Sequence, residues 1–219
     1  MQILYIDIHT HNPKQQSQVF KLPNVIFGKE NILSQSCSLG IHPWYIPEHF
    51  DQAIQELSSK ALQTNILAIG ECGLDKLCET DWNLQIDTFR SQIALAQSMQ
   101  KPLIIHCVRA YQEVMELLKN HHVTVPTIFH GFNKKYELAQ SILSKGYYLS
   151  LGSSILNGSQ DRLIQEADLN KIFLETDNKS TNIVDIYTYF CAARKISLEQ
   201  LQDQLFQNFV NVFRYSIEE

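Results

Sequence analysis

The fold is decided by residues 102–130, which read PLIIHCVRAYQEVMELLKNHHVTVPTIFH. Two short apolar runs, Pro102–Ile105 and Pro126–Phe129, enclose a stretch in which Val114, Leu117 and Leu118 recur with helical spacing. This order predicts two parallel strands joined by a crossover helix. Because both strands are apolar throughout, we expect helices to cover both faces of their sheet.

The same alternation extends along the whole chain. The candidate strands are Ile3–Ile8, Gln18–Leu22, Ser36–Ile41, Asn65–Ile69, Pro102–Ile105, Pro126–Phe129, Tyr147–Leu151 and Lys171–Leu174. Eight such runs, most of them followed by a helical pattern, predict an α/β fold, a distorted (β/α)8 TIM barrel, with a doubly wound open sheet as the competing architecture. The connections at Asn12–Ser17 and Val25–Gln35 are short, so we expect the first two crossover helices of the barrel to be shortened or missing.

Length and composition limit the remaining possibilities. The chain has 219 residues, 44% of them hydrophobic, and a net charge of −5. This length, without internal repeats or linker-like stretches, predicts one domain over residues 1–219. The apolar content excludes a disordered chain. The acidic balance excludes a nucleic-acid binder that acts through a broadly basic surface.

The compartment can also be predicted. The N-terminus has no basic region and reaches an acid at Asp7, so we expect no signal peptide. No apolar run approaches the roughly 18 residues that would cross a bilayer. Five cysteines without a CxxC pair favour reduced thiols over a disulfide framework. We therefore expect a cytoplasmic protein that does not contact membranes.

Histidines and carboxylates follow several of the apolar runs. Alternation along a strand sends His9 and His11 to the same side, where two neutral imidazoles can chelate one divalent ion. The set of such residues is His9, His11, Glu71, His106, His130 and Asp177. Each residue alone is compatible with an ordinary hydrogen-bonded role. Together they stand at the C-terminal ends of five strands, where barrel active sites are built, and they predict a two-metal hydrolytic site.

Six motifs resemble those of one known family. They are His9-Thr10-His11, Gly40-Ile41-His42-Pro43, Gly70-Glu71-Cys72-Gly73-Leu74-Asp75, Ile104-Ile105-His106-Cys107, Phe129-His130-Gly131-Phe132 and Glu175-Thr176-Asp177. Their order is similar to that in TatD-type metal-dependent hydrolases, and the resemblance extends from about residue 3 to residue 213. It implies a distorted (β/α)8 barrel, a site for one or two metal ions and hydrolysis of phosphodiesters, typically as a deoxyribonuclease.

The resemblance also implies roles for the ligand residues. It assigns six ligands in two groups, His9, His11 and Asp177 for one ion and His106 and His130 for the other, with Glu71 bridging the two ions. Because imidazole and carboxylate ligands accept several divalent ions, Mg, Mn, Zn, Co and Ni all remain candidates.

Catalytic and substrate-binding roles are also expected. Asp177, bound to one ion and close to the attacking water, is the candidate general base, and Glu71 acts with it at the metal site. The resemblance implies that His42 faces the substrate and binds phosphate or assists the metals. Lys76 and Arg109 are candidates to anchor a flanking phosphate, although each could equally be a solvated surface charge.

The sequence departs from the family pattern in loops that shape the substrate pocket. Lys76 stands where the family has an aromatic residue, and Val108-Arg109 stands where it has an arginine–aspartate pair. Asn178-Lys179-Ser180 stands where the family has Ser-Pro after the last aspartate. Trp44 and Tyr45, in the loop of His42, could stack on a base or simply pack the loop.

Three functions remain open from the sequence. The leading prediction is an exonuclease-type deoxyribonuclease acting on DNA ends or single strands, or on a small phosphodiester. The alternative uses the same metals on an ester, lactone or amide, including an aminoacyl-tRNA. The third is a non-catalytic barrel in which metals serve stability. The protein is expected to be a monomer.

Overall fold

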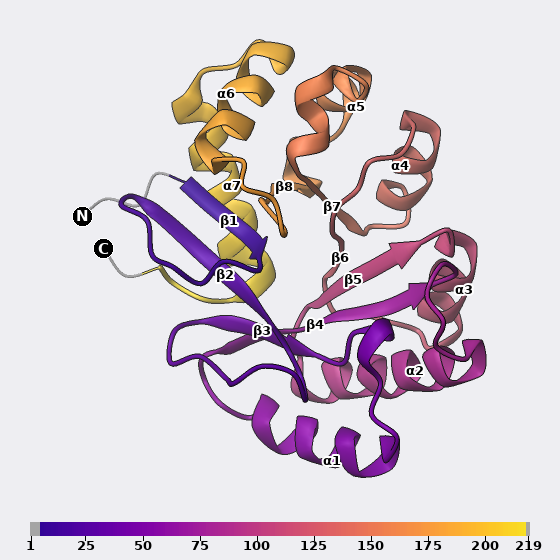
Figure 1. Cartoon of the computed structure of the whole chain (residues 1–219). Helices are drawn as coiled ribbons and strands as arrows, with labels where there is room; N and C mark the ends of the chain where they lie inside the picture. The colour runs from indigo at the N-terminus through magenta and orange to yellow at the C-terminus, as the bar shows by residue number, and fades with distance from the viewer. Residues whose placement is uncertain (1–4, 218–219) are drawn as a thin grey trace. The chain divides into compact units, whose positions relative to one another are not determined.

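The computed structural model describes residues 5–217 of the chain and contains two compact units (Figure 1). Unit 1 comprises the residues up to Pro23 together with those from Phe129 onward, and unit 2 comprises Asn24–Ile128. Ile3 and Leu4, at the start of the first predicted strand, lie outside the described residues. The organisation of residues 1–219 as one domain stays a prediction.

The predicted fold class is confirmed. All eight strands form, and their order in the sheet is their order in the sequence. The pairings recorded within each unit are parallel. Between the first three strands, residues 11–18 and 27–36 contain no helix, as the short connections predicted. This arrangement is that of a (β/α)8 barrel without its first two crossover helices.

Unit 2 contains the strands and helices of the middle of the chain. Its elements are the end of β2 (Val19–Ile26), β3 (Cys37–Gly40), the 3-10 helix η1 (Pro43–Tyr45), α1 (Phe50–Ala61), β4 (Ile66–Asp75), α2 (Trp82–Met99), β5 (Leu103–Val108), α3 (Tyr111–Asn120) and the start of β6 (Thr127–Phe129). In Figure 1, α1 and α2 lie side by side, and α2 packs against β4. The apolar faces of these helices cover the buried strands.

Unit 1 contains the two ends of the chain. Its elements are β1 (Tyr5–Thr10), the start of β2, α4 (Tyr136–Leu143), β7 (Tyr148–Leu151), η2 (Ser153–Asn157), α5 (Asp161–Glu166), η3 (Leu169–Lys171), β8 (Ile172–Leu174), α6 (Ile183–Arg194) and α7 (Leu198–Phe213). A capping box at Ser197 and Gln200 opens α7, with both of its hydrogen bonds present. The sequence did not predict α5 or α6.

Two glycines let β4 and β5 approach each other closely. A Cβ on Gly73 would lie 2.0 Å from the carbonyl oxygen of His106, and a Cβ on Gly70 would lie 2.5 Å from that of Ile104. Both glycines have positive φ angles, 145° and 152°, which other residues adopt only with strain. The glycines therefore bring the backbone of Glu71 against that of β5.

Within residues 5–217, no helix is long and apolar enough to cross a membrane.

Candidate metal centres

Unit 2 brings together His42, which follows β3, Glu71, which lies within β4, and His106, which lies within β5. Glu71 Oε1 lies 2.6 Å from His106 Nδ1 and 3.3 Å from His42 Nε2. His42 and Glu71 are buried, and the side chain of His106 is only slightly exposed. A buried carboxylate requires polar partners, and the two imidazoles supply them.

Hydrogen bonds from distant residues fix this trio. The backbone N–H of Glu71 donates to Asn24 Oδ1 at 2.7 Å. Gln92, on α2, accepts from the N–H of Ile41 at 2.8 Å and donates to its carbonyl oxygen at 3.0 Å. The chain that enters His42 is therefore held through both backbone polar groups of Ile41.

The tautomer of neutral His42 follows from its hydrogen bonds. His42 Nδ1 accepts from the backbone N–H of Trp44 at 3.1 Å, so Nδ1 carries no proton. The proton of a neutral ring is then on Nε2, which faces Glu71 Oε1. His42 is thus set up as a hydrogen-bond donor, the role that a phosphate-binding group requires.

Asp75 organises the other side of His106. Its Oδ2 lies 3.1 Å from His106 Nε2 and accepts from Trp44 Nε1 at 2.6 Å, while its Oδ1 accepts from the backbone N–H of Leu77 at 2.7 Å. Burial alone would raise the pKa of Asp75, but the hydrogen bonds from these three groups lower it to about 2. A permanently charged carboxylate can orient an imidazole that offers Nδ1 to a metal ion.

Unit 1 gathers a second group around Asp177. Asp177 Oδ1 lies 3.8 Å from His9 Nε2 and 3.6 Å from His11 Nε2. The ring of His130 lies with its centroid 4.1 Å from that of His9. His9 is fully buried, whereas the side chain of Asp177 is 29% exposed.

Backbone pairing places these residues beside one another. The N–H of Asp177 donates to the carbonyl oxygen of His9 at 2.9 Å, and the N–H of His11 donates to that of Asp177 at 3.0 Å. This parallel bridge continues the β1 edge past the end of β8. Asp177 has a φ of 53°, so the chain turns away directly after presenting its carboxylate.

Glu175 contacts the candidate ligand His130, a contact that the sequence did not predict. Glu175 is fully buried, and its Oε1 lies 3.2 Å from His130 Nδ1 and accepts from the N–H of Gly131 at 2.8 Å. A carboxylate at this distance can fix the orientation of the His130 ring. The sequence signal that could have indicated Glu175 is the same as for Glu71, namely a carboxylate directly after a buried apolar run.

Asp7 is a second buried carboxylate whose contacts the sequence did not predict. Its two carboxylate oxygens accept from the backbone N–H of Thr176 at 2.9 Å and from its hydroxyl at 2.6 Å. Burial raises the pKa of Asp7 to about 7, against the effect of these hydrogen bonds. Asp7 thus ties β1 to the segment that carries Glu175 and Asp177.

The donor sets of both units fit a divalent ion. In one trio, His9, His130 and Asp177 offer ligand atoms that lie within 4.8 Å of one another. The same holds for His42, Glu71 and His106 as a trio of donor atoms. Mixed imidazole and carboxylate donors suit Zn, Mn, Co or Ni, and carboxylates suit Mg.

The two predicted substrate-binding cations, Lys76 and Arg109, have different surroundings. Lys76 forms an ion pair with Glu113, and its ammonium lies 5.6 Å from the centroid of the Trp82 ring. Arg109 is exposed, with a φ of 54° directly after β5. Their roles toward a substrate stay predictions.

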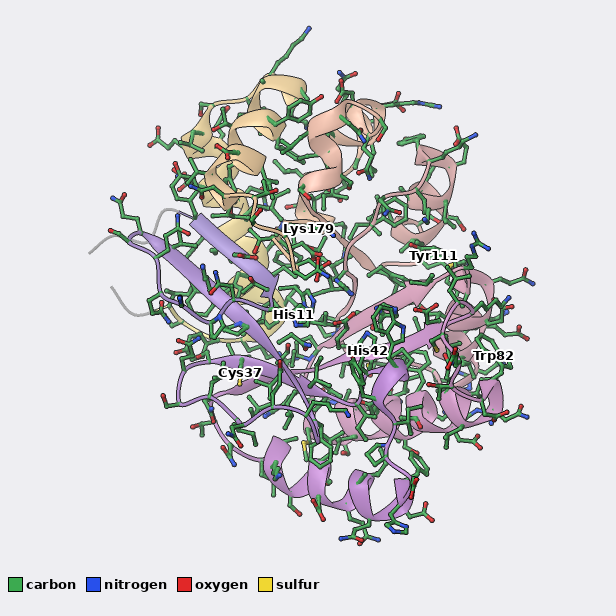
Figure 2. The ribbon with its side chains drawn as sticks, in the orientation of Figure 1. His11, Cys37, His42, Trp82, Tyr111 and Lys179 are labelled. Atoms are coloured by element: carbon green, nitrogen blue, oxygen red, sulfur yellow. The ribbon has the colours of Figure 1, made fainter. Side chains whose placement is uncertain are left out.

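A small pocket lies beside Asp177 in unit 1. Its walls include Asn133, Ser153, Ser154 and Lys179, and its volume is about 90 Å³. Lys179, labelled in Figure 2, belongs to the loop after β8 that departs from the family pattern. A pocket of this size has room for a compact group such as a phosphoryl group.

Comparisons with known proteins agree on one family. The model of the TatD-related DNase family matches residues 25–214. An uncharacterised metal-dependent hydrolase of Haemophilus influenzae is 27% identical over 198 residues, which are 80% of this chain and 76% of that protein.

Two solved structures show the same fold. YjjV, a TatD homolog from Escherichia coli K12, matches with a TM-score of 0.86 and 21% identity, over 99% of this chain and 100% of that one. The phosphotriesterase homology protein of Escherichia coli, solved with phosphate in its active site, matches with a TM-score of 0.64 and 15% identity, over 81% of this chain and 74% of that one. Because the family model covers most of its length, the chain belongs to the TatD-related DNase family of metal-dependent hydrolases.

Proposed function

We propose that this protein is a divalent-metal-dependent phosphodiesterase that acts as an exonuclease-type deoxyribonuclease on DNA ends or single strands. The observation that carries the proposal is that each unit gathers a trio of imidazole and carboxylate donors. The family name supports DNA as the substrate. The phosphate in the active site of the phosphotriesterase homology protein supports a phosphoryl group.

The proposed ligands divide between the two units. In unit 1, His9, His11 and Asp177 would hold an ion, and the trio geometry favours His130 as a further ligand there. In unit 2, Glu71 and His106 would hold an ion, whereas the bridging role of Glu71 stays a prediction. When bound, a divalent ion lowers the pKa of water and neutralises charge on phosphoryl oxygens.

Asp177 is the proposed general base. Its carboxylate is partly exposed, and its Oδ1 faces two imidazoles rather than a fixed hydrogen-bond donor at short range. It can therefore accept the proton of the attacking water and later return it to the leaving oxygen. The pocket beside Asp177 gives the reacting phosphoryl group a place next to this carboxylate.

His42 and Lys179 are the proposed phosphate-binding groups of their respective units. The tautomer of His42 presents an N–H from Nε2, which can donate to a phosphoryl oxygen. The ammonium of Lys179 lines the pocket beside Asp177 and can neutralise a second oxygen. Because the chain carries a net charge of −5, we propose that it binds DNA weakly and transiently. We also propose that it acts in the cytoplasm as a monomer.

A substrate panel tests the proposal. The purified protein is treated with chelator, dialysed and assayed with Mg, Mn, Co or Zn on single-stranded DNA, duplex DNA, an aryl phosphodiester and carboxylic esters. We expect metal-dependent release of nucleotides from single-stranded DNA, with slower cleavage of the small phosphodiester. Full activity in chelator would refute a metal-dependent site.

The same panel separates the competing functions. Turnover of esters or lactones, with none on any phosphodiester, would replace the nuclease by a carboxylic ester hydrolase. Stoichiometric metal binding without turnover of any substrate would support a non-catalytic barrel.

A further inference from the structure

Two aromatic side chains stand exposed directly after His42. Trp44 is 52% exposed and Tyr45 is 38% exposed, and both belong to η1. Large aromatic rings usually gain stability by burial, so an exposed pair beside a candidate active site requires an explanation. Leu77, 61% exposed, adds a third apolar side chain close to Asp75 along the chain.

Trp44 is held in place despite its exposure. Its indole Nε1–H donates to the buried carboxylate of Asp75 at 2.6 Å, and its backbone N–H donates to His42 Nδ1. Its ring meets the rings of His42 and His106 edge to face, with centroids 5.1 Å and 6.0 Å away. The ring is therefore already ordered, so that a ligand that stacks on it loses little further entropy.

Loop packing does not account for this arrangement. A ring that served only to fill the loop would be expected to be buried, whereas about half of the surface of Trp44 remains accessible. The polar atom of the indole is already hydrogen-bonded to Asp75, so it does not account for the exposure of the ring. Lys29 Nζ lies 5.2 Å from the centroid of Tyr45, which adds a cation at the edge of the aromatic pair.

We propose that Trp44, with Tyr45 beside it, forms a stacking platform for an unpaired nucleobase of the substrate strand. The two rings have centroids 6.3 Å apart and planes inclined at 70°, so a base that stacks on Trp44 would meet the Tyr45 ring at an angle, and Lys29 offers a charge for a neighbouring phosphate. His42 lies next to the platform and is the proposed phosphate-binding donor. This inference rests on the proposed function and adds to it a preference for bases that are not stacked within a duplex.

Fluorescence tests the platform directly. The chain has two tryptophans, so the Trp82→Phe variant leaves Trp44 as its single indole reporter. The metal-loaded variant is mixed in a stopped-flow instrument with a single-stranded tetrathymidylate, and emission is recorded before turnover. We expect saturable quenching with this ligand, and much weaker quenching with the same backbone carrying abasic sites. The Trp44→Phe variant, which keeps Trp82, is the matched control and should give no base-dependent signal.

Kinetics separate stacking from an anchoring role toward Asp75. Trp44→Leu should raise KM for single-stranded DNA about ten- to a hundred-fold with little change in kcat. Trp44→Phe keeps a ring but loses the indole N–H, so it should retain most of the affinity. Equal losses in both variants, together with a fall in kcat, would refute stacking and leave only the anchoring of Asp75.

The remaining outcomes distinguish the two proposals. Base-dependent quenching without hydrolysis of any phosphodiester would support the platform and refute the proposed function. Hydrolysis of DNA with identical quenching by the thymidine and abasic ligands, or with no quenching, would refute the platform alone.

Discussion

The two donor groups differ in the distance between their carboxylate and their imidazole nitrogens. In unit 2, Glu71 Oε1 lies at hydrogen-bond distance from His106, 2.6 Å, and close to His42, 3.3 Å. In unit 1, Asp177 Oδ1 lies 3.6 Å and 3.8 Å from His11 and His9, beyond ordinary hydrogen-bond range. Glu71 is buried, whereas Asp177 is partly exposed.

This difference suits the two donor groups to different roles, metal binding and proton transfer. A buried, hydrogen-bonded carboxylate is rigid, and an ion that binds Glu71 must replace the hydrogen bond to His106. A partly exposed carboxylate at longer range from its neighbours is better placed to exchange protons with water. The donor group of unit 2 is therefore suited to holding a metal ion, and that of unit 1 to proton transfer.

Removing one carboxylate from each group gives the largest expected effects. Asp177→Asn and Glu71→Gln should each lower kcat on the order of a thousand-fold, because Asp177 is the proposed base and Glu71 a proposed ligand. Metal content, measured by mass spectrometry of the purified variants, should fall more in Glu71→Gln. The comparison fails if only Asp177→Asn loses metal.

Exposed carboxylates supply the controls for these variants. Glu56→Gln in α1 of unit 2 and Glu166→Gln in α5 of unit 1 should keep wild-type kcat and metal content. A similar loss in either control would mean that net charge, rather than ligation, governs the effect.

Each unit also contains a carboxylate in contact with a candidate ligand histidine. Asp75 contacts His106 Nε2 at 3.1 Å, and Glu175 contacts His130 Nδ1 at 3.2 Å. Asp75→Ala and Glu175→Ala should each weaken metal affinity or activity about ten- to a hundred-fold. Isothermal titration with Zn or Mn measures the affinity.

Conservative variants separate orientation from folding. Glu175→Gln keeps an acceptor for the N–H of Gly131 and should recover much of the affinity lost in Glu175→Ala. A Glu175→Ala protein that folds normally and binds metal like the wild type would remove this carboxylate from the site.

Much of this arrangement could be predicted from local sequence. The strands were found because each is a short apolar run between polar segments, and the candidate ligands were proposed because they stand directly after those runs. The prediction missed the end of β4: it stopped at Ile69, whereas the strand continues to Asp75. There the backbone N–H of Asp75 is satisfied by Gln85 from α2, a contact that local pattern does not contain.

The missed parts depend on contacts between distant residues. Glu175 orients His130 from 45 positions away, and Asp7 binds Thr176 from the other end of the chain. The exposure of Trp44 likewise results from three-dimensional packing, and sequence left stacking and loop packing open. In each case the residue type was visible but its partner was not.

A matched pair of cations away from the ligands compares the stability of the two units. In unit 2, Lys101 Nζ donates to the carbonyl oxygens of Ala61 and Ile66, around the end of α1. In unit 1, Arg194 donates to those of Ile164 and Ala167, around the end of α5. Lys101→Met and Arg194→Met should each lower the free energy of unfolding by about 2 kcal/mol, measured by urea denaturation.

Exposed lysines provide the reference for these two substitutions. Lys119→Met in unit 2 and Lys145→Met in unit 1 remove a charge without removing such a set of acceptors, and should change stability by less than about 0.5 kcal/mol. Unequal losses for Lys101→Met and Arg194→Met would show that one helix end matters more to its unit than the other.

The thiols give the smallest expected effect and test whether the donor set of unit 2 is complete. Cys72 is next to Glu71, but its Sγ lies 3.7 Å from the carbonyl oxygen of Ile104, within the buried packing. Burial raises the pKa of Cys72, and it raises that of Cys37 to about 11. Since the thiolate is the reactive form, alkylation at pH 8 should leave both thiols unmodified, with or without metal, while Cys191 of unit 1 reacts slowly. Peptide mass spectrometry after timed labelling measures each site. Labelling of Cys72 in chelator that disappears when metal is added would instead make this thiol a ligand, and the contrast between the two donor groups would then include their chemistry as well as their spacing.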